Sequence, residues 1–431
     1  MKLLWFIIIA FLNILTLGCT TEETEGPLPD IQISKPTESQ AFGYSDTVVV
    51  KAQILHQQNI DYVRVAITND ESVTMLPVQM FYPGTHDYSL ETTLILDNLQ
   101  IESGHLTINI RAGSANGLSN EWVGIYYSAP EKSLKSLLVV TKNTGSGFTV
   151  WDLLSDGTES DRFSFNGDYT GSAVSSKYQQ FYKAGSVIDN LSTWDLRVDQ
   201  ISWTVPAVPA PPLPYFTAVY SDNNEIFDAT RDALISGYST SGINTFRSKQ
   251  FSNGYFTSIF RYKTWVIAFF DTFNSAYNKL VAFNYPGGTV FREAELTGTV
   301  VSISESGEDG LLLYVNYEMQ SAVLNYNLEA NSFAKLKDFP QGNIKRVSMT
   351  DVMDAFLSFT DGIYWYRPAT ASMVKILPID HATDLAYDPI LRKLFVAYGK
   401  TVELYHLPDS APAETWVMND SIVHIHLLYN K

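Results

Sequence analysis

Cysteine is almost absent from this chain of 431 residues, because Cys19 is the only one. An intramolecular disulfide and a metal site built on several thiolates are therefore excluded. A hydrophobic core has to stabilise the fold instead. The composition is ample for one, since 45% of the residues are hydrophobic and 13% are aromatic.

Positive charge is scarce as well. Lys and Arg number 29 against 46 Asp and Glu, so the formal net charge is −17, and no long basic run occurs. Binding of phosphates requires a cationic surface. A nucleic-acid partner is therefore not expected, and the acidity is interpreted mainly as a solubility device.

Helical patterns and catalytic motifs are also missing. After residue 134 no stretch of a dozen residues keeps a 3.6-residue hydrophobic period. We find no nucleophile elbow, phosphate-binding loop or dinucleotide fingerprint. Tyr, Phe and Trp are abundant instead, and these residues pack well in strands. The sequence therefore predicts an all-β protein and suggests no cofactor.

Residues 1–18 have the features of a signal peptide. Lys2 provides a positive charge, and the apolar run Leu3–Leu17 is shorter than the about 20 residues of a membrane span. The run ends in Leu15-Thr16-Leu17-Gly18-Cys19, which resembles the lipobox of bacterial lipoproteins. The resemblance implies a diacylglycerol group, and acyl chains such as palmitate, on Cys19. Thr16 departs from the usual leucine, and an ordinary signal peptide with an incidental cysteine is the alternative.

The segment 19–29 is expected to be an acidic, flexible tether, Cys-Thr-Thr-Glu-Glu-Thr-Glu-Gly-Pro-Leu-Pro. It resembles the acidic export signals of surface lipoproteins in Bacteroidota, while a plain solvated linker is the alternative. Several acyl chains hold a protein stably on a bilayer. The resemblance thus implies a lipid anchor at the outer membrane of a Gram-negative bacterium, facing the cell surface.

Residues 30–129 alternate apolar and polar residues in seven short runs separated by turn residues. Such a pattern is typical of an immunoglobulin-like sandwich. The stretch Leu106–Ala112, followed by Asn116-Gly117, resembles the closing hairpin of bacterial immunoglobulin-like and fibronectin-like modules. The expected strands are 31–33, 47–54, 62–68, 73–82, 88–96, 105–112 and 122–127.

Residues 134–431 contain a repeated motif, a small residue between two apolar or Thr-like ones. The central positions are 45, 40, 44, 46, 38 and 38 residues apart by subtraction, which suits the four-stranded blades of a β-propeller. The innermost strands converge at the ring axis and leave room only for small side chains. The seven copies are Ser172–Val174, Thr217–Val219, Thr257–Ile259, Val301–Ile303, Val347–Met349, Leu385–Tyr387 and Val423–Ile425.

The ends of this region predict how the ring closes. Only three strands precede residue 167, whereas the final segment Ser421–Tyr429 is a lone strand with the innermost motif. Pairing the two completes a seventh blade and removes free sheet edges. The segment Asp384–Pro389, followed by Lys393–Ala397, resembles blades of quinoprotein-like and surface-layer-type propellers, a superfamily that shares no single activity.

Ligands of such a ring are expected at the mouth of its central channel. The residues two positions before the small one include Phe216, Phe256, Arg346 and Asp384, and His424 replaces a small residue in the last copy. Buried polar groups near an apolar axis need partners or water. These five residues are the candidate ligand contacts, although an Arg346–Asp384 bridge that locks neighbouring blades is the alternative.

A metal site is not expected. His424 and His426 are predicted to point to opposite faces of their strand, so that they do not share a metal, and the acidic turns lack calcium-loop spacing.

Two functions remain open. The favoured one is a surface lipoprotein whose propeller binds a glycan, a small nutrient or an envelope protein. The alternative is a propeller enzyme, a glycosidase or lyase, that acts on polysaccharide, which requires a pair of carboxylates at a defined separation.

Overall fold

The computed structural model describes residues 26–431 except 146, 154–157, 308, 309, 351, 352, 408 and 410. The described chain forms two compact units, one that ends at Glu131 and one that begins at Lys132. Its regular structure is β-strand apart from a short 3-10 turn, η1, at Pro368–Thr370. In this part of the chain no helix has the length and apolar character to cross a membrane.

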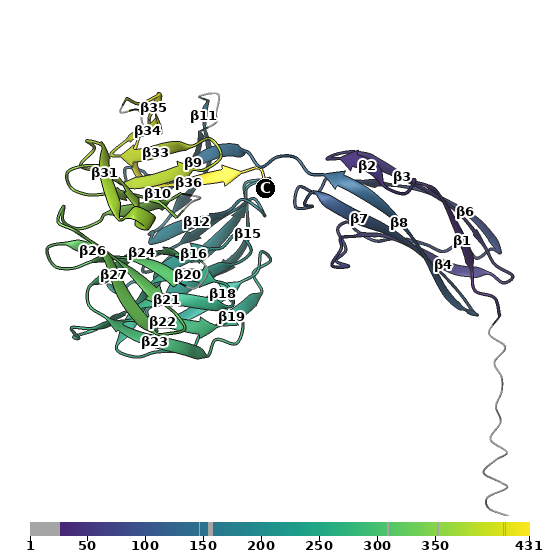
Figure 1. The fold of residues 1–431 in the computed structure, drawn as a ribbon, viewed down its shortest axis with the longest axis horizontal. Coiled ribbons are helices and arrows are strands. Elements are labelled where there is room, and N and C mark those ends of the chain that lie inside the picture. The colour runs from purple at the N-terminus through teal and green to yellow at the C-terminus, as the bar shows by residue number, and fades with distance from the viewer. Residues whose placement is uncertain are drawn as a thin grey trace, which may run out of the picture. The chain divides into compact units, whose positions relative to one another are not determined.

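The smaller unit is a sandwich of two sheets (Figure 1). Alternate residues of its strands point inward, such as Val48, Val50 and Ile54, and both sheets contribute to one hydrophobic core. In spatial order the sheets are β1 (Asp30–Lys35), β3 (Thr47–Leu55), β6 (Asp87–Ile95), and β2 (Gln40–Gly43), β8 (Gly117–Ser128), β7 (Gly104–Ser114), β4 (Ile60–Thr68), β5 (Gln79–Phe81).

This sandwich has eight strands among the described residues instead of the seven that the sequence predicts. The additional strand is β2, which pairs in parallel with β8. Its sequence Gln-Ala-Phe-Gly is too short to show an alternation, so no run was recognisable there. The expected strand 73–82 is reduced to β5, because the residues before it form a loop.

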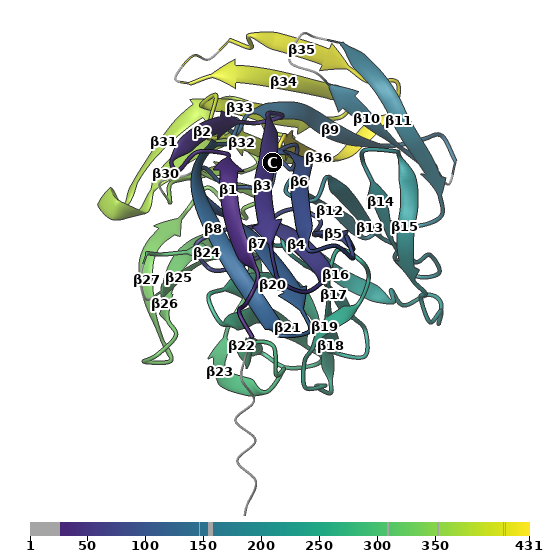
Figure 2. The ribbon, with the colours of Figure 1, turned by 90° about the vertical axis from the view of Figure 1, so that its right-hand side faces the viewer.

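The larger unit consists, over the described residues, of seven four-stranded antiparallel sheets that follow one another around a centre (Figure 2). The first four are β12 (Gly171–Ser175), β13 (Gln180–Ala184), β14 (Leu191–Asp195), β15 (Gln200–Val205); β16 (Phe216–Ser221), β17 (Ile226–Thr230), β18 (Leu234–Tyr238), β19 (Asn244–Arg247); β20 (Gly254–Tyr262), β21 (Trp265–Thr272), β22 (Asn278–Asn284), β23 (Val290–Leu296); and β24 (Thr299–Glu305), β25 (Gly310–Asn316), β26 (Ser321–Asn327), β27 (Ser332–Phe339).

The remaining three sheets complete the ring. They are β28 (Arg346–Met349), β29 (Ala355–Ser358), β30 (Ile363–Arg367), β31 (Ser372–Leu377); β32 (Asp384–Asp388), β33 (Lys393–Tyr398), β34 (Thr401–His406), β35 (Glu414–Val417); and β36 (Ser421–Tyr429), β9 (Leu134–Lys142), β10 (Gly147–Leu153), β11 (Glu159–Asn166). In the last sheet the C-terminal strand β36 pairs with β9, the pairing that the sequence predicts.

The innermost strands contact one another in a closed order, which makes the arrangement a ring. Each copy of the sequence motif lies in one of them, and the order of contacts is β12, β16, β20, β24, β28, β32, β36 and back to β12. The apolar side chains are divided correspondingly into seven clusters, each filled by two neighbouring sheets. The core is thus distributed around the ring, and each sheet is stabilised by both neighbours.

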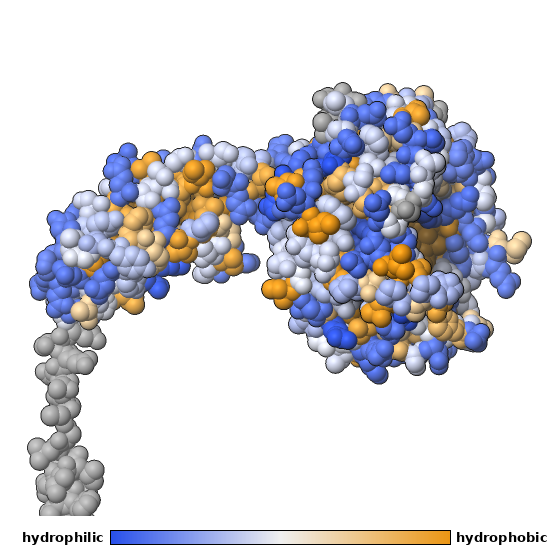
Figure 3. Space-filling model, turned by 180° about the vertical axis from the view of Figure 1, so that it is seen from behind, coloured by the Kyte–Doolittle hydropathy of each residue, from blue (hydrophilic) through white to orange (hydrophobic). Residues whose placement is uncertain are grey.

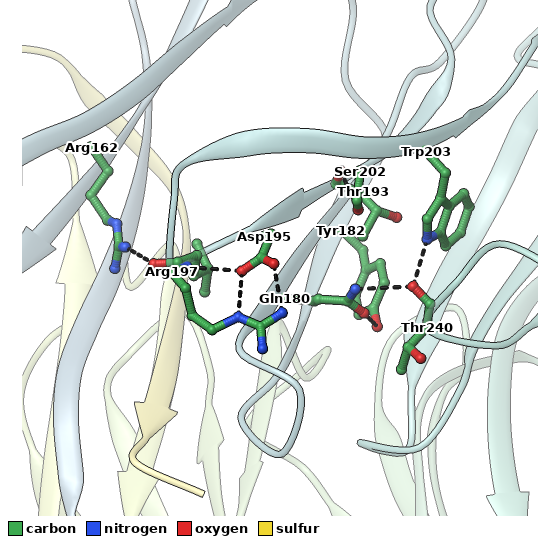
Figure 4. A network of polar contacts seen from close by, with 10 residues as sticks. Arg162, Gln180, Tyr182, Thr193, Asp195, Arg197, Ser202, Trp203 and Thr240 are labelled. Carbon is green, nitrogen blue, oxygen red and sulfur yellow. Dashed lines mark hydrogen bonds and ion pairs between the residues drawn. The ribbon is translucent and has the colours of Figure 1, made fainter. Parts of the chain in front are cut away.

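Polar contacts add to these clusters between the sheets β12–β15 and β16–β19. The backbone carbonyl of Thr240, in the loop after β18, accepts hydrogen bonds from Gln180 Nε2 and Trp203 Nε1, both at 3.0 Å (Figure 4). Tyr182 in turn donates to Gln180 Oε1 at 2.7 Å. Because Gln180 is buried and Trp203 is partly buried, their two bonds to Thr240 fix the two sheets relative to each other, and Tyr182 orients the Gln180 amide.

Tyr429, at the end of β36, fastens the closing sheet to both of its neighbours. Its backbone N–H donates to Ser176 Oγ at 3.0 Å, and its carbonyl accepts from Gln179 Nε2 at 2.7 Å. Its hydroxyl donates to Asp388 Oδ1 at 3.2 Å on the other side. The Lys132 ammonium lies 4.5 Å from the centre of the Tyr429 phenol ring. One residue therefore joins three consecutive sheets.

We expect Tyr429→Ala to lower the free energy of unfolding of the larger unit by about 3–5 kcal/mol, because a large buried ring is lost. Tyr429→Phe removes only the hydroxyl and should cost about 1 kcal/mol. Chemical denaturation followed by tryptophan fluorescence measures both. The control is Tyr82→Ala, since Tyr82 is 75% exposed. A loss for Tyr429→Ala no larger than for this control would contradict the role of Tyr429.

Candidate functional site

A cavity of about 450 Å³ lies among the innermost strands, at the centre of the ring. This volume is in the range of small-molecule sites. Its wall consists of small, hydroxyl-bearing, aliphatic and aromatic residues with one imidazole. The lining residues are Thr170, Gly171, Ser172, Thr217, Ala218, Val219, Tyr220, Thr257, Ser258, Ile259, Phe260, Val301, Ser302, Ile303 and His424.

A β-bulge recurs in four of the innermost strands and decides which side chains reach the channel. In β16, β20, β24 and β36 the register shifts by one residue, at Thr217, Thr257, Val301 and Val423. A bulge of this kind changes the direction of the neighbouring side chains. Thr217, for example, donates its hydroxyl hydrogen to the Phe256 carbonyl of the next sheet at 2.6 Å.

The bulges explain why Phe216 and Phe256 do not line the cavity. Both residues directly precede a bulge, and both are fully buried. Each packs in the hydrophobic cluster between its own sheet and the preceding one. A regular alternation of side chains would turn both phenyl rings toward the channel, and the extra residue in each strand reverses this direction. The two phenyl groups pack between neighbouring sheets and stabilise the propeller instead of lining the cavity.

The strands β28 and β32 have no register shift, and here the polar candidates do come together. Arg346 Nε lies 3.8 Å from Asp384 Oδ1, and His424 Nδ1 lies 3.2 Å from Asp384 Oδ2. The three residues come from three consecutive innermost strands. The Arg346 contact is long and its side chain is 44% exposed, so the ion pair by itself stabilises little.

Asp384 is the fixed centre of this group. Its carboxylate accepts the backbone N–H of Leu385 at 2.9 Å and that of Ile425 at 3.0 Å. Burial acts to raise the pKa of Asp384, but the hydrogen bond and charge of His424, the Ile425 N–H and the charge of Arg346 outweigh it. The pKa of Asp384 is therefore below its ordinary value, and the carboxylate is ionised at neutral pH.

His424 is the polar residue of this group that lines the cavity. Asp384 holds its Nδ1, and the Tyr169 ring packs edge-on against the imidazole at 5.8 Å between centroids. Within the described chain Nε2 has no hydrogen-bond partner. A carboxylate that fixes one ring nitrogen leaves the other oriented for a ligand.

His426 lies beside His424, contrary to the prediction that the two rings occupy opposite faces. The rings are stacked, with centroids 5.8 Å apart and planes 7° from parallel. The prediction was wrong because side chains two residues apart share a face of a strand. No group of three or more His, Cys, Asp or Glu residues in the described chain is placed to hold a metal.

Ser172 and Tyr169 continue the polar group and were not recognised in the sequence. Ser172 Oγ lies 2.7 Å from His426 Nε2 and 2.6 Å from the Tyr169 hydroxyl. Ser172 was visible as part of the repeated motif, but its proximity to His426 depends on ring closure, which brings residues 254 positions apart together. No local pattern indicates such a pair.

A serine beside a histidine suggests a nucleophile and its base, but the electrostatics oppose this role. Desolvation, together with the neighbouring His424, lowers the pKa of His426 to about 3, although Asp384 acts to raise it. A general base is efficient when its pKa is near the working pH. His426 is thus a weak base that stays neutral and accepts a hydrogen bond from Ser172 or donates one to it.

Cys19, the predicted lipidation site, lies outside the described residues. Its role therefore stays a prediction.

Comparison by structure finds proteins similar to the larger unit, whereas comparison by sequence finds none. No protein-family model and no curated protein matches the chain. A solved protein from Lactobacillus plantarum aligns with 69% of this chain and 99% of its own, at 14% identity and a TM-score of 0.50. The Dos1 propeller aligns over 68% and 88%, at 12% identity and 0.46. The β-propeller domain of Cps50 (Swd1) from Myceliophteria thermophila aligns over 61% and 90%, at 11% identity and 0.46. At such identities a likeness extends to the fold alone. The closed ring of four-stranded antiparallel sheets is by itself the arrangement of a β-propeller.

The low pKa of His426 predicts a pH dependence of stability. The unfolded chain binds a proton near pH 6.5 and the folded one only near pH 3, so acidification between these values favours unfolding. From pH 6.5 to about 4 this group should remove at most roughly 3 kcal/mol. His426→Gln should flatten the pH profile of urea unfolding, whereas His381→Gln, at an exposed histidine, should not. Parallel profiles for the wild type and His426→Gln would contradict the assignment.

Proposed function

We propose that the protein is a binding protein whose propeller holds a small, uncharged, hydroxyl-rich ligand, such as the end of an oligosaccharide, in its central channel. The observation that carries the proposal is the wall of the cavity. Six of its residues bear Ser or Thr hydroxyls, and His424 presents an oriented imidazole nitrogen. Aliphatic side chains between them suit the apolar faces of such a ligand.

Acid–base catalysis on polysaccharide is the less favoured function. Hydrolysis of a glycosidic bond generally requires two carboxyl groups on either side of the substrate. None of the described residues that line the cavity is Asp or Glu. Asp384 stands behind His424 and is already engaged by two backbone N–H groups and the imidazole.

In this proposal the propeller has seven blades, closed by β36, and is the recognition head of a lipoprotein. The eight-stranded sandwich is an immunoglobulin-like stalk, and residues 19–29 are the tether. Cys19 carries the lipid that holds the protein at the outer membrane, on the cell surface. Support comes from the lipobox-like sequence and the acidic segment after it. Exposed hydrophobic side chains on the face drawn in Figure 3 are scattered among hydrophilic ones, as in a soluble head.

Filling the channel should abolish binding. We expect one or more members of a panel of malto-, xylo- and N-acetylglucosamine oligosaccharides to raise the melting temperature of the protein, and Ser302→Phe to remove this shift because the ring occupies the cavity. His424→Ala should weaken binding about tenfold or more by deleting one oriented hydrogen bond. Thermal shift and isothermal titration measure both effects.

The matched control for the channel variant is Ser332→Phe, at the exposed first residue of β27. It introduces the same ring outside the channel and should leave binding unchanged. If no oligosaccharide binds, or if Ser302→Phe binds as well as Ser332→Phe, the channel is not the site.

Lipidation is tested separately in the native host. Cys19→Ser should remove the acyl groups from the N-terminus and take the protein out of the outer membrane, because the lipid anchor is lost. Mass spectrometry of the N-terminal peptide and separation of inner and outer membranes measure this. Retention of the variant in the outer-membrane fraction, or an unmodified Cys19 in the wild type, would refute the anchor.

A further inference from the structure

The outward face of the five-stranded sheet in the smaller unit exposes two aromatic side chains on one strand. Trp122 is 60% and Tyr126 is 53% exposed, and both belong to β8. Residues four positions apart share a face of a strand and are separated by about 13 Å. Trp and Tyr are enriched at interfaces, so two of them on one open sheet face make that face a candidate binding surface.

Two arginines lie on the same face, and neither has an acidic partner among the residues that the structure describes. Arg64 of β4 is directly opposite Arg111 of β7 in the sheet. Arg111 Nε donates to Asn120 Oδ1 at 2.8 Å, and neither guanidinium forms an ion pair with a described residue. Like charges opposite each other destabilise a sheet. In a chain of net charge −17, such an unneutralised pair is suited to an anion from outside.

The arginines lie between aromatic rings. Trp122 follows Asn120 by two residues, and Tyr62 precedes Arg64 by two, so both rings share the outward face with the pair. The Tyr62 ring covers Gly113, where an added Cβ would come within 2.2 Å of it. Toward Tyr126 the charge reverses, because Asp70 pairs with His105 at 3.2 Å and Glu38 accepts the Gly124 N–H at 3.0 Å.

We propose that this face binds an anionic polysaccharide, with a carboxylate or sulfate group on Arg64 and Arg111 and sugar rings stacked on Trp122 and, further along β8, on Tyr126. A single guanidinium group recognises a carboxylate or a phosphate-like anion by donating two parallel hydrogen bonds, and two neighbouring guanidinium groups add their charges. The flat aromatic rings match the apolar faces of pyranose rings. An acidic peptide fits less well, because extended peptides bind at free strand edges rather than across a sheet face.

The experiment uses the full chain and isothermal titration with oligogalacturonate and chondroitin sulfate. Maltoheptaose and poly-glutamate serve as the neutral and the peptide probe, and any binding of maltoheptaose by the channel should be the same in the wild type and in the arginine variant. Arg64→Gln/Arg111→Gln should weaken binding of an anionic glycan at least about tenfold, because charge-assisted hydrogen bonds are lost. Trp122→Ala should also weaken it, and raised salt should reduce wild-type affinity.

The control for charge is Lys249→Ala/Lys400→Ala, which removes two exposed positive charges from the other unit. Circular dichroism and melting curves establish that each variant is folded. Channel variants such as Ser302→Phe should bind the anionic glycan normally, which separates this site from the channel.

The proposal is overturned if the wild type binds neither anionic glycan, or if the arginine pair and the lysine control behave alike. It is also overturned if poly-glutamate binds as tightly as the glycans and Trp122→Ala has no effect, since the face would then be a peptide site.

Discussion

The closure of the ring by β36 is the constraint on which the rest of the structure depends. Each sheet of the larger unit buries both of its faces against neighbours, so a ring without β36 would expose apolar side chains of the adjoining sheets and the unpaired edge of β9. The backbone pairing of β36 with β9 fills the gap with the last residues of the chain. The complete ring therefore requires a contact between the two ends of this unit.

The candidate site is a product of the same closure. Asp384 belongs to β32, His424 and His426 to β36, and Ser172 to β12, so the polar group spans the joint between the end and the beginning of the ring. The bulges in β16, β20, β24 and β36 bury the residues that precede them, whereas the regular strands β28 and β32 bring Arg346 and Asp384 within 3.8 Å of each other. The candidate site and the core thus draw on the same seven innermost strands. The local register of each strand decides which of its side chains are buried in the core.

The sequence was sufficient to predict the all-β fold, the positions of the innermost strands and the pairing of the last strand, because all three follow from a repeat spacing and a strand count. It was not sufficient for β2, whose four residues carry no alternation. It also misplaced Phe216 and Phe256, because a single inserted residue reverses the direction of a side chain without changing the composition. The Ser172–His426 contact joins residues at opposite ends of the ring and has no local signal.

Disulfide trapping tests ring closure most directly. In a chain with Cys19→Ser, cysteines at Leu137 and Leu427, which are paired across β9 and β36, are close enough for a disulfide. We predict that Leu137→Cys/Leu427→Cys forms this bond on mild oxidation, as detected by mass spectrometry, whereas the offset pair Leu137→Cys/Ile425→Cys does not. No bond in the first variant, or equal yields in both, would contradict a ring closed by its C-terminal strand.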